Sequence, residues 1–280
     1  MRLQIPKLYK IASGGLAAAC AAILLPLSAG YSTPASAALA NCTSATSCGV
    51  TFTLGSTPIG STTWVQDENG NLSLDTAPLL NNPAGLWDQG AGGALIWSGN
   101  GVTLTVNNGG QADPSITFGY VIDNDTNAAI AFTANQFLPI LGLTGPIHAR
   151  STLVTSVQPD TGFVGTVVPT SGTGFIADSQ DIRSVPPASL DKGVDIGGVC
   201  GPTGLSSPTA CVEPEQNSFF NLDGTYDTMN VNVGFQVSPH TVGSVVGLVD
   251  QTVVPEPSTY GLLLAGLAFI GFVARRRLSA

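Results

Sequence analysis

The sequence predicts an all-β fold: an antiparallel β-sandwich of roughly ten or more strands between a signal peptide and a C-terminal transmembrane helix. Short runs between residues 49 and 250 alternate apolar and polar residues, and Thr, Val, Ile and Phe dominate them, as in half-buried strands. Gly, Pro, Asn and Asp cluster between these runs, where turns need them. No part of the middle region sustains the 3.6-residue apolar period of a helix.

Each expected strand is one of these runs: GVTFTL (49–54), TTWVQ (62–66), NLSLD (71–75), GALIWS (93–98), GVTLTVN (101–107), SITFGYVID (115–123), AAIAFTA (128–134), STLVTSVQ (151–158), GFVGTVV (162–168), TMNVNVGFQVS (228–238) and VGSVVGLVD (242–250). The turn DENG between WVQ and NLSL predicts a hairpin. Residues 41–252 are expected to form one acidic domain, because no linker divides them. Residues 178–225 have the weakest strand signal and are rich in Pro, Gly and Ser, which predicts a long loop stapled by a disulfide.

The N-terminus predicts export. A basic segment, MRLQIPKLYK, precedes the apolar run IASGGLAAACAAILLPLS and then small residues, so residues 1–40 are interpreted as a signal peptide. Cleavage after Ala37 and cleavage after Ala40 both fit, and an uncleaved anchor helix is the alternative. The expected partners at this step are the Sec export machinery and signal peptidase. Cys20 lies inside the apolar run, which argues against a lipoprotein.

Four cysteines remain after removal of the signal peptide, and an even number in an oxidising compartment favours disulfides. Each pair closes a short local loop, so Cys42–Cys48 and Cys200–Cys211 are the expected bridges. The chain-entropy model gives at most about 2.4 and 2.8 kcal/mol for them. Their spacings match no zinc pattern.

The charges exclude nucleic acid as a partner. Residues 41–254 contain 17 acidic residues against three basic ones, which are Arg150, Arg183 and Lys192. Polyanions and anionic membrane faces repel such a body.

No catalytic motif stands out, and the chain is expected not to be an enzyme. Both histidines, His148 and His240, are interpreted as ordinary loop residues. Three carboxylate pairs would suit a glycosidase but are interpreted as turn residues: Asp123 with Asp125, Glu213 with Glu215, and Asp223 with Asp227. No metal site or cofactor is expected, and calcium at DENGN or DNDTN is a minor alternative.

Trp87 is the candidate ligand-binding residue. Trp64 and Trp97 lie in expected strands and are assigned to the core, whereas Trp87 lies in the loop-like segment NNPAGLWDQG. An exposed ring at Trp87 would suit stacking against a sugar.

The C-terminal segment predicts a membrane helix. Residues 259–274 are sixteen uncharged, mostly apolar residues that span about 24 Å as a helix, and three arginines follow. Arg275, Arg276 and Arg277 are expected to stay cytoplasmic. The prolines of the preceding Pro-Glu-Pro triplet favour an extended, accessible backbone over residues 253–258.

This order of Pro255-Glu256-Pro257-Ser258, the apolar run and the arginines resembles the PEP-CTERM sorting signal of Gram-negative bacteria, here residues 253–280. The resemblance implies that an exosortase, a membrane protease, recognises the triplet and removes the tail. It also implies transient anchoring in the inner membrane, followed by delivery to the cell surface or the extracellular matrix.

The expected function is therefore a non-enzymatic structural or adhesive role for an exported surface or biofilm-matrix protein, with exopolysaccharide as a candidate partner. The alternative is a carbohydrate-binding module or a glycoside hydrolase that acts on surface polysaccharide.

Overall fold

A computed structural model describes residues 42, 44–45, 48–82, 85–111, 115–170, 174–184, 188–191, 193–204, 208–254 and 257–278. The predicted signal peptide lies outside these residues. The elements, in chain order, are β1 (Gly49–Leu54), β2 (Thr57–Gln66), β3 (Asn71–Leu74), α2 (Ala77–Leu80), β4 (Trp87–Gln89), η1 (Ala91–Gly93), β5 (Leu95–Gly99), β6 (Val102–Gln111), β7 (Ser115–Asn124), β8 (Ile130–Pro159), β9 (Gly165–Pro169), β10 (Ala177–Ser184), β11 (Ala188–Asp191), β12 (Cys200–Thr203), β13 (Thr209–Val237), β14 (Thr241–Val253) and α3 (Pro257–Leu278).

The strands confirm the all-β class but not the two separate sheets of a sandwich. In the described residues, fourteen strands form one sheet with the main order β1-β2-β3-β6-β7-β14-β8-β13-β10-β11. β1 also pairs with β8, so the sheet curls round on itself and is nearly closed into a barrel. All of its pairings are antiparallel.

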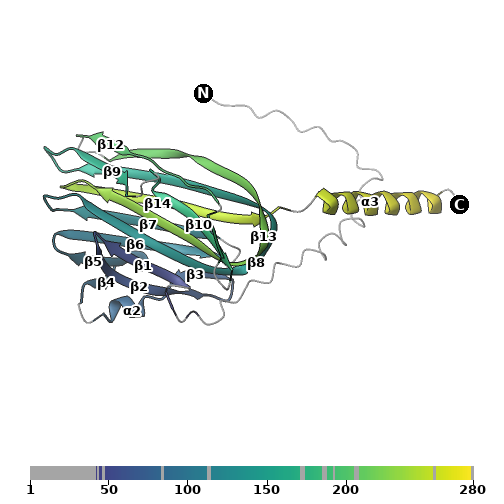
Figure 1. Cartoon of the computed structure of the whole chain (residues 1–280), viewed down its shortest axis with the longest axis horizontal. Coiled ribbons are helices and arrows are strands. Elements are labelled where there is room, and N and C mark those ends of the chain that lie inside the picture. Colours follow the sequence, from purple (N-terminus) through teal and green to yellow (C-terminus); the bar gives the residue numbers. More distant parts are fainter. Residues whose placement is uncertain are drawn as a thin grey trace, which may run out of the picture. The chain divides into compact units, whose positions relative to one another are not determined.

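The long strand β8 makes this closure, and the long strand β13 pairs along its other edge. They pair along most of their length, and the register shifts between Leu222 and Thr228, where both curve at one end of the sheet (Figure 1). Along the other side of β8, β1 pairs with its first part, up to Phe137, and β14 pairs with its second part, from Ile147 onward. One bent strand therefore joins both ends of the series β1-β2-β3-β6-β7-β14.

The core lies inside the curled sheet. Alternate residues of the strands point inward, and the aromatic rings among them form one cluster. Phe132 is fully buried there, with its ring centroid 4.9 Å from that of Tyr120 and 5.5 Å from that of Phe235. Burial also raises the pKa of Tyr120 well above its usual value, and its hydroxyl accepts a hydrogen bond of 2.7 Å from Asn108 Nδ2.

The predicted hairpin is confirmed by the pairing of β2 with β3, which matches Gln66 to Leu72. Asp67 closes its turn by accepting hydrogen bonds from the backbone N–H groups of Asn69 and Asn71.

The long loop predicted over residues 178–225 is wrong. The structure places β10, β11, β12 and the first part of β13 there. Val194, Ile196 and Cys200 from this segment are buried. Pro and Gly weaken the period-two signal, yet cross-strand partners supply the hydrogen bonds that hold these residues in strands.

The C-terminal segment is helical, as predicted, and forms α3. In the part of the chain that the structure describes, no helix is both long enough and apolar enough to cross a membrane. The membrane crossing predicted for residues 259–274 is therefore not confirmed.

We expect Phe132→Ala to lower the free energy of unfolding by about 3–5 kcal/mol, because it leaves a cavity in the aromatic cluster. Urea denaturation measures this loss, and Val212→Ala, at a side chain that is 72% exposed, is the control, expected to change stability by less than about 0.5 kcal/mol. A loss below about 1 kcal/mol at Phe132 would contradict the cluster's role.

Candidate functional site at the end of the last strand

The last strand of the sheet runs directly into the C-terminal segment. β14 lies between β7 and β8, and its final residue, Val253, pairs with Ile147. The backbone N–H of Val254 donates a hydrogen bond of 2.8 Å to the carbonyl oxygen of Pro146. Residues 255 and 256 lie outside the described residues, and α3 begins at Pro257.

The prediction of an extended backbone over residues 253–258 is thus correct at Val253 and wrong at Pro257 and Ser258, which are helical. Proline favours the first turn of a helix because its φ is already helical and it has no N–H to satisfy there. Of the predicted sorting motif, Pro255 and Glu256 lie outside the described residues.

A row of three side chains lies beside this exit point. Thr252, His148 and Phe219 are matched in register on β14, β8 and β13. The rings of His148 and Phe219 stack with centroids 4.4 Å apart and planes 15° apart. His148 Nε2 lies 3.0 Å from Asn217 Oδ1, at hydrogen-bonding distance. Phe219 nevertheless remains 71% exposed.

The next row of the same surface carries charge. Arg150 Nε donates a hydrogen bond of 3.0 Å to Asp250 Oδ2, and Arg150 Nη1 lies 3.9 Å from Glu215 Oε2. The hydrogen bond and charge of Asp250 raise the pKa of Arg150 above its usual value. The guanidinium of Arg150 is therefore held in place and charged. Arg150 is one of three basic residues in the predicted mature body.

The expectation that Trp87 is exposed is wrong. Its ring is only 3% exposed, its indole N–H donates a hydrogen bond of 2.9 Å to the Ile59 carbonyl oxygen, and it packs 5.6 Å from the ring of Phe52. The segment around it looked like a loop, but Trp87 begins β4 and pairs with Trp97. A buried ring offers no face to a sugar.

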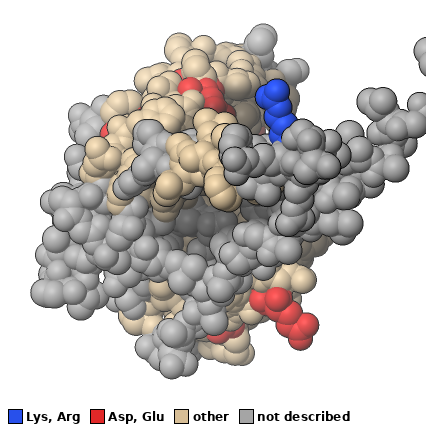
Figure 2. Space-filling model, turned by 90° about the vertical axis from the view of Figure 1, so that its right-hand side faces the viewer, with Lys and Arg blue, Asp and Glu red and all other residues tan. Residues whose placement is uncertain are grey.

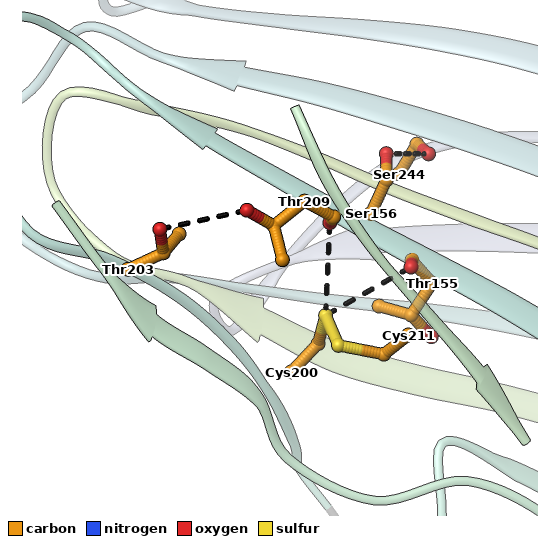
Figure 3. The surroundings of a disulfide bond; sticks show 7 residues. All are labelled: Thr155, Ser156, Cys200, Thr203, Thr209, Cys211 and Ser244. Carbon is orange, nitrogen blue, oxygen red and sulfur yellow. Dashed lines mark hydrogen bonds between the residues drawn. A yellow bond between two sulfur atoms is a disulfide. The ribbon is translucent and has the colours of Figure 1, made fainter. Parts of the chain in front are cut away.

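Both predicted disulfides are present, Cys42–Cys48 and Cys200–Cys211. Figure 3 shows the second bridge beside Thr155, and Cys200 Sγ lies 3.8 Å from the Thr155 carbonyl oxygen and 3.9 Å from that of Thr209. These are packing contacts, because a disulfide sulfur carries no proton to donate. The bridge ties β12 to β13, the region that was predicted to be a stapled loop.

The acidic pairs do not converge on a shared site in the described residues. Asp123, at the end of β7, is partly buried; this burial first, and the charges of Asp125 and Asp160 second, raise its pKa. Glu213 and Glu215 lie on β13, and Glu215 faces Arg150. The side chains of Asp223 and Asp227 lie outside the described set.

The two histidines lie near opposite ends of β14. His148 pairs with Thr252 at its C-terminal end and belongs to β8 rather than to the predicted loop. His240 precedes β14, with Nε2 3.0 Å from Asn127 Oδ1 and its ring 4.1 Å from that of Phe163. Both histidines are therefore held by an asparagine and a phenylalanine. Among the described residues, no group of three or more His, Cys, Asp or Glu is placed to hold a metal ion.

Sequence reasoning missed the row of Thr252, His148 and Phe219. Its members lie far apart in the chain, and only the register of three strands brings them together. The sole local signal was Phe219 itself, in a segment that had been assigned to a loop.

The match at the C-terminus decides what this end of the molecule is for, because residues 253–277 fit the PEP-CTERM protein-sorting motif. The chain carries a PEP-CTERM sorting signal. This motif implies export, processing by an exosortase and sorting to the cell surface. It begins at the last residue of β14, so sheet and signal meet without a linker.

No curated protein matches the chain. Among solved structures, it is similar to the enzymatically active domain of tailspike protein 4 of bacteriophage CBA120, at 17% identity and a TM-score of 0.26. The likeness covers 57% of this chain and 19% of the tailspike chain, and it carries no argument about function.

We expect the double variant Cys200→Ala/Cys211→Ala to lower the free energy of unfolding by about 2–3 kcal/mol, because the unfolded chain regains the entropy of an open loop. Denaturant titration under oxidising conditions measures the loss. Added reductant should destabilise the wild type but have no further effect at this bridge in the variant; equal stability of the two oxidised proteins would contradict the prediction.

We expect Asp123→Asn to stabilise the protein by up to about 1 kcal/mol at pH 7. A carboxyl group whose pKa is raised by folding costs stability as the pH rises from its usual pKa through the raised one, and asparagine removes this cost. Melting curves should show the gain at neutral pH and none at a pH below the usual pKa. Asp88→Asn, on β4, is the control, and a gain of the same size at low pH would refute the electrostatic origin.

Proposed function

We propose that the mature body is a non-enzymatic structural or adhesive protein of the cell surface or extracellular matrix. The PEP-CTERM signal delivers it there. During delivery, the sorting signal at residues 253–277 holds the precursor transiently at the inner membrane, with Arg275–Arg277 on the cytoplasmic side. An exosortase-type protease then removes the tail, and exopolysaccharide is the candidate partner after release.

The observation that carries this proposal is the direct joint between β14 and the sorting motif. Hydrogen bonds to β8 hold the body's chain up to Val254, and the motif follows at once. The sheet needs nothing beyond this residue to complete its pairing. The tail is therefore a segment that can be removed without opening the sheet, as a temporary signal requires.

The side chains on the described surface support a non-enzymatic role. His148 stacks on Phe219, His240 packs against Phe163 with tilted rings, and Arg150 is engaged by Asp250 and Glu215. The alternative of a carbohydrate-binding module relied on an exposed Trp87, which is buried, and the alternative of a glycoside hydrolase relied on an acidic pair. The described acidic pairs do not converge on a shared site, and Glu215 faces Arg150, so no observation favours either alternative.

Deletion of Pro255–Pro257 is expected to leave the precursor uncut and retained in the inner membrane, because the protease loses its recognition element. Mass spectrometry of the protein from the membrane fraction and the culture supernatant measures the length of the C-terminus. The control is Glu213→Ala/Pro214→Ala, which changes a similar Glu-Pro sequence on β13 and should be processed normally. Release of the deletion variant at the wild-type rate and mass would show that the motif does not direct processing.

A further inference from the structure

We propose that the processing enzyme binds the folded body as well as the sorting motif, through a surface formed by Thr252, His148 and Phe219. We call this the exit surface. The proposal rests on the proposed function, since it assumes an exosortase-type enzyme that grips the Pro-Glu-Pro triplet.

The chain between the sheet and the Pro-Glu-Pro triplet is very short. Val254 is fixed to Pro146 by its backbone hydrogen bond, and an extended chain advances at most about 3.6 Å per residue. Pro257 therefore lies within roughly 11 Å of the last sheet-bonded residue. An enzyme that encloses residues 255–257 has no room to stay clear of the folded body and must contact the end of the sheet.

The ring of Phe219 is exposed beside the point where the chain leaves the sheet. It is 71% exposed, so this ring presents apolar surface to solvent on the outer face of the sheet. Buried aromatic side chains are enriched at the centres of protein interfaces. The stack on His148, and the hydrogen bond from His148 to Asn217, already hold the Phe219 ring, so its binding costs little side-chain entropy.

Charged groups lie beside these residues on the same face of the sheet. Arg150, Asp250 and Glu215 lie in the adjacent row, where Arg150 is held by both carboxylates. An apolar centre beside a polar rim is the usual anatomy of a specific protein interface. Figure 2 shows one face of the molecule on which most of the described surface is uncharged.

The fold supplies its own comparison at the far end of β14. Phe163 packs against His240 with the two ring planes tilted by 33°, and Asn127 lies at hydrogen-bonding distance from His240. This second pair has the same residue types as the first, with Asp160 Oδ2 4.0 Å from His240 Nδ1 in addition. β14 contains 13 residues, which places the second pair about 40 Å from the motif. If exposure of a His–Phe pair were sufficient for binding, the enzyme would bind at both pairs. The proposal assigns binding only to the pair beside the motif.

The test follows processing of the full-length precursor by pulse-chase in cells that contain the exosortase. Phe219→Ala is expected to lengthen the precursor half-life at least about fivefold, the effect of removing a moderate interface anchor. Phe163→Ala and Val212→Ala should leave the half-life unchanged. Phe219→Tyr, which keeps the ring, should restore most of the rate, and Phe219→Gln should slow processing as alanine does.

Melting temperatures of the variants separate binding from folding. Phe219 is an exposed residue, so we expect the melting temperature to stay at the wild-type value in Phe219→Ala. Slow processing that tracks a lowered melting temperature in all Phe219 variants would overturn the proposal, because loss of folding would then explain it.

Wild-type processing of Phe219→Ala would also overturn it. If that variant is cut normally but leaves vesicles of inner-membrane lipid more readily, the surface contacts lipid; if it instead loses retention on cell-surface polysaccharide, the surface binds glycan. Deletion of Pro255–Pro257 distinguishes failure of the exit-surface proposal from failure of the proposed function. A block by the deletion together with normal cutting of Phe219→Ala refutes only the exit surface.

Discussion

The insertion of β14 between β7 and β8 is the constraint on which the rest of the structure depends. It is the last strand in the chain, yet both of its edges are paired, over Thr241–Asp250 with β7 and Thr241–Val253 with β8. Without it, the closed path through β1 and β8 would be broken, and two long strand edges would be left open to other chains. Gly247 shows how closely it fits, since an added Cβ there would lie 2.5 Å from Phe118. The sheet is therefore incomplete until the C-terminal part of the chain arrives.

The sequence was sufficient where a strand could be recognised by itself. GVTFTL is β1 without a change of boundary, and the DENG turn lies between β2 and β3. It was insufficient where distant pairing decides the structure. β8 merges two predicted strands across the segment GPIHARS, which has turn formers but pairs with β13. The same effect explains the strands found in residues 178–225 and the burial of Trp87, whose loop-like neighbours hide a short edge strand. Propensity is a local property, whereas closure of the sheet is not.

The functional segment shows the same division. The sorting motif is a linear signal, so residues 253–277 could be identified from their order alone. The disulfides could be predicted because each closes a short local loop. The row of Thr252, His148 and Phe219 could not, because its members lie on three strands and meet only through the register of β8 with β13 and β14. Among the aromatic side chains, the sequence indicated that Trp87 was exposed, but Trp87 is buried, and the exposed ring of Phe219 lies in a segment that was predicted to be a loop.

If the processing enzyme contacts the end of the sheet, this arrangement couples folding to processing. A chain that is exported from its N-terminus brings β14 out after the other strands, and Pro257 follows three positions after Val254, the last residue bonded to the sheet. Pairing of distant strands is slow compared with local turns, so closure of the sheet is the late step in folding. While β14 is unpaired, the motif is attached to a flexible segment. Once the N–H of Val254 bonds to Pro146, the motif is held close to one end of the sheet. An enzyme that also contacts that end would cut the completed body faster than an unfolded chain carrying the same motif. Docking of the last strand would in that case be a check that the protein has folded before its tail is removed.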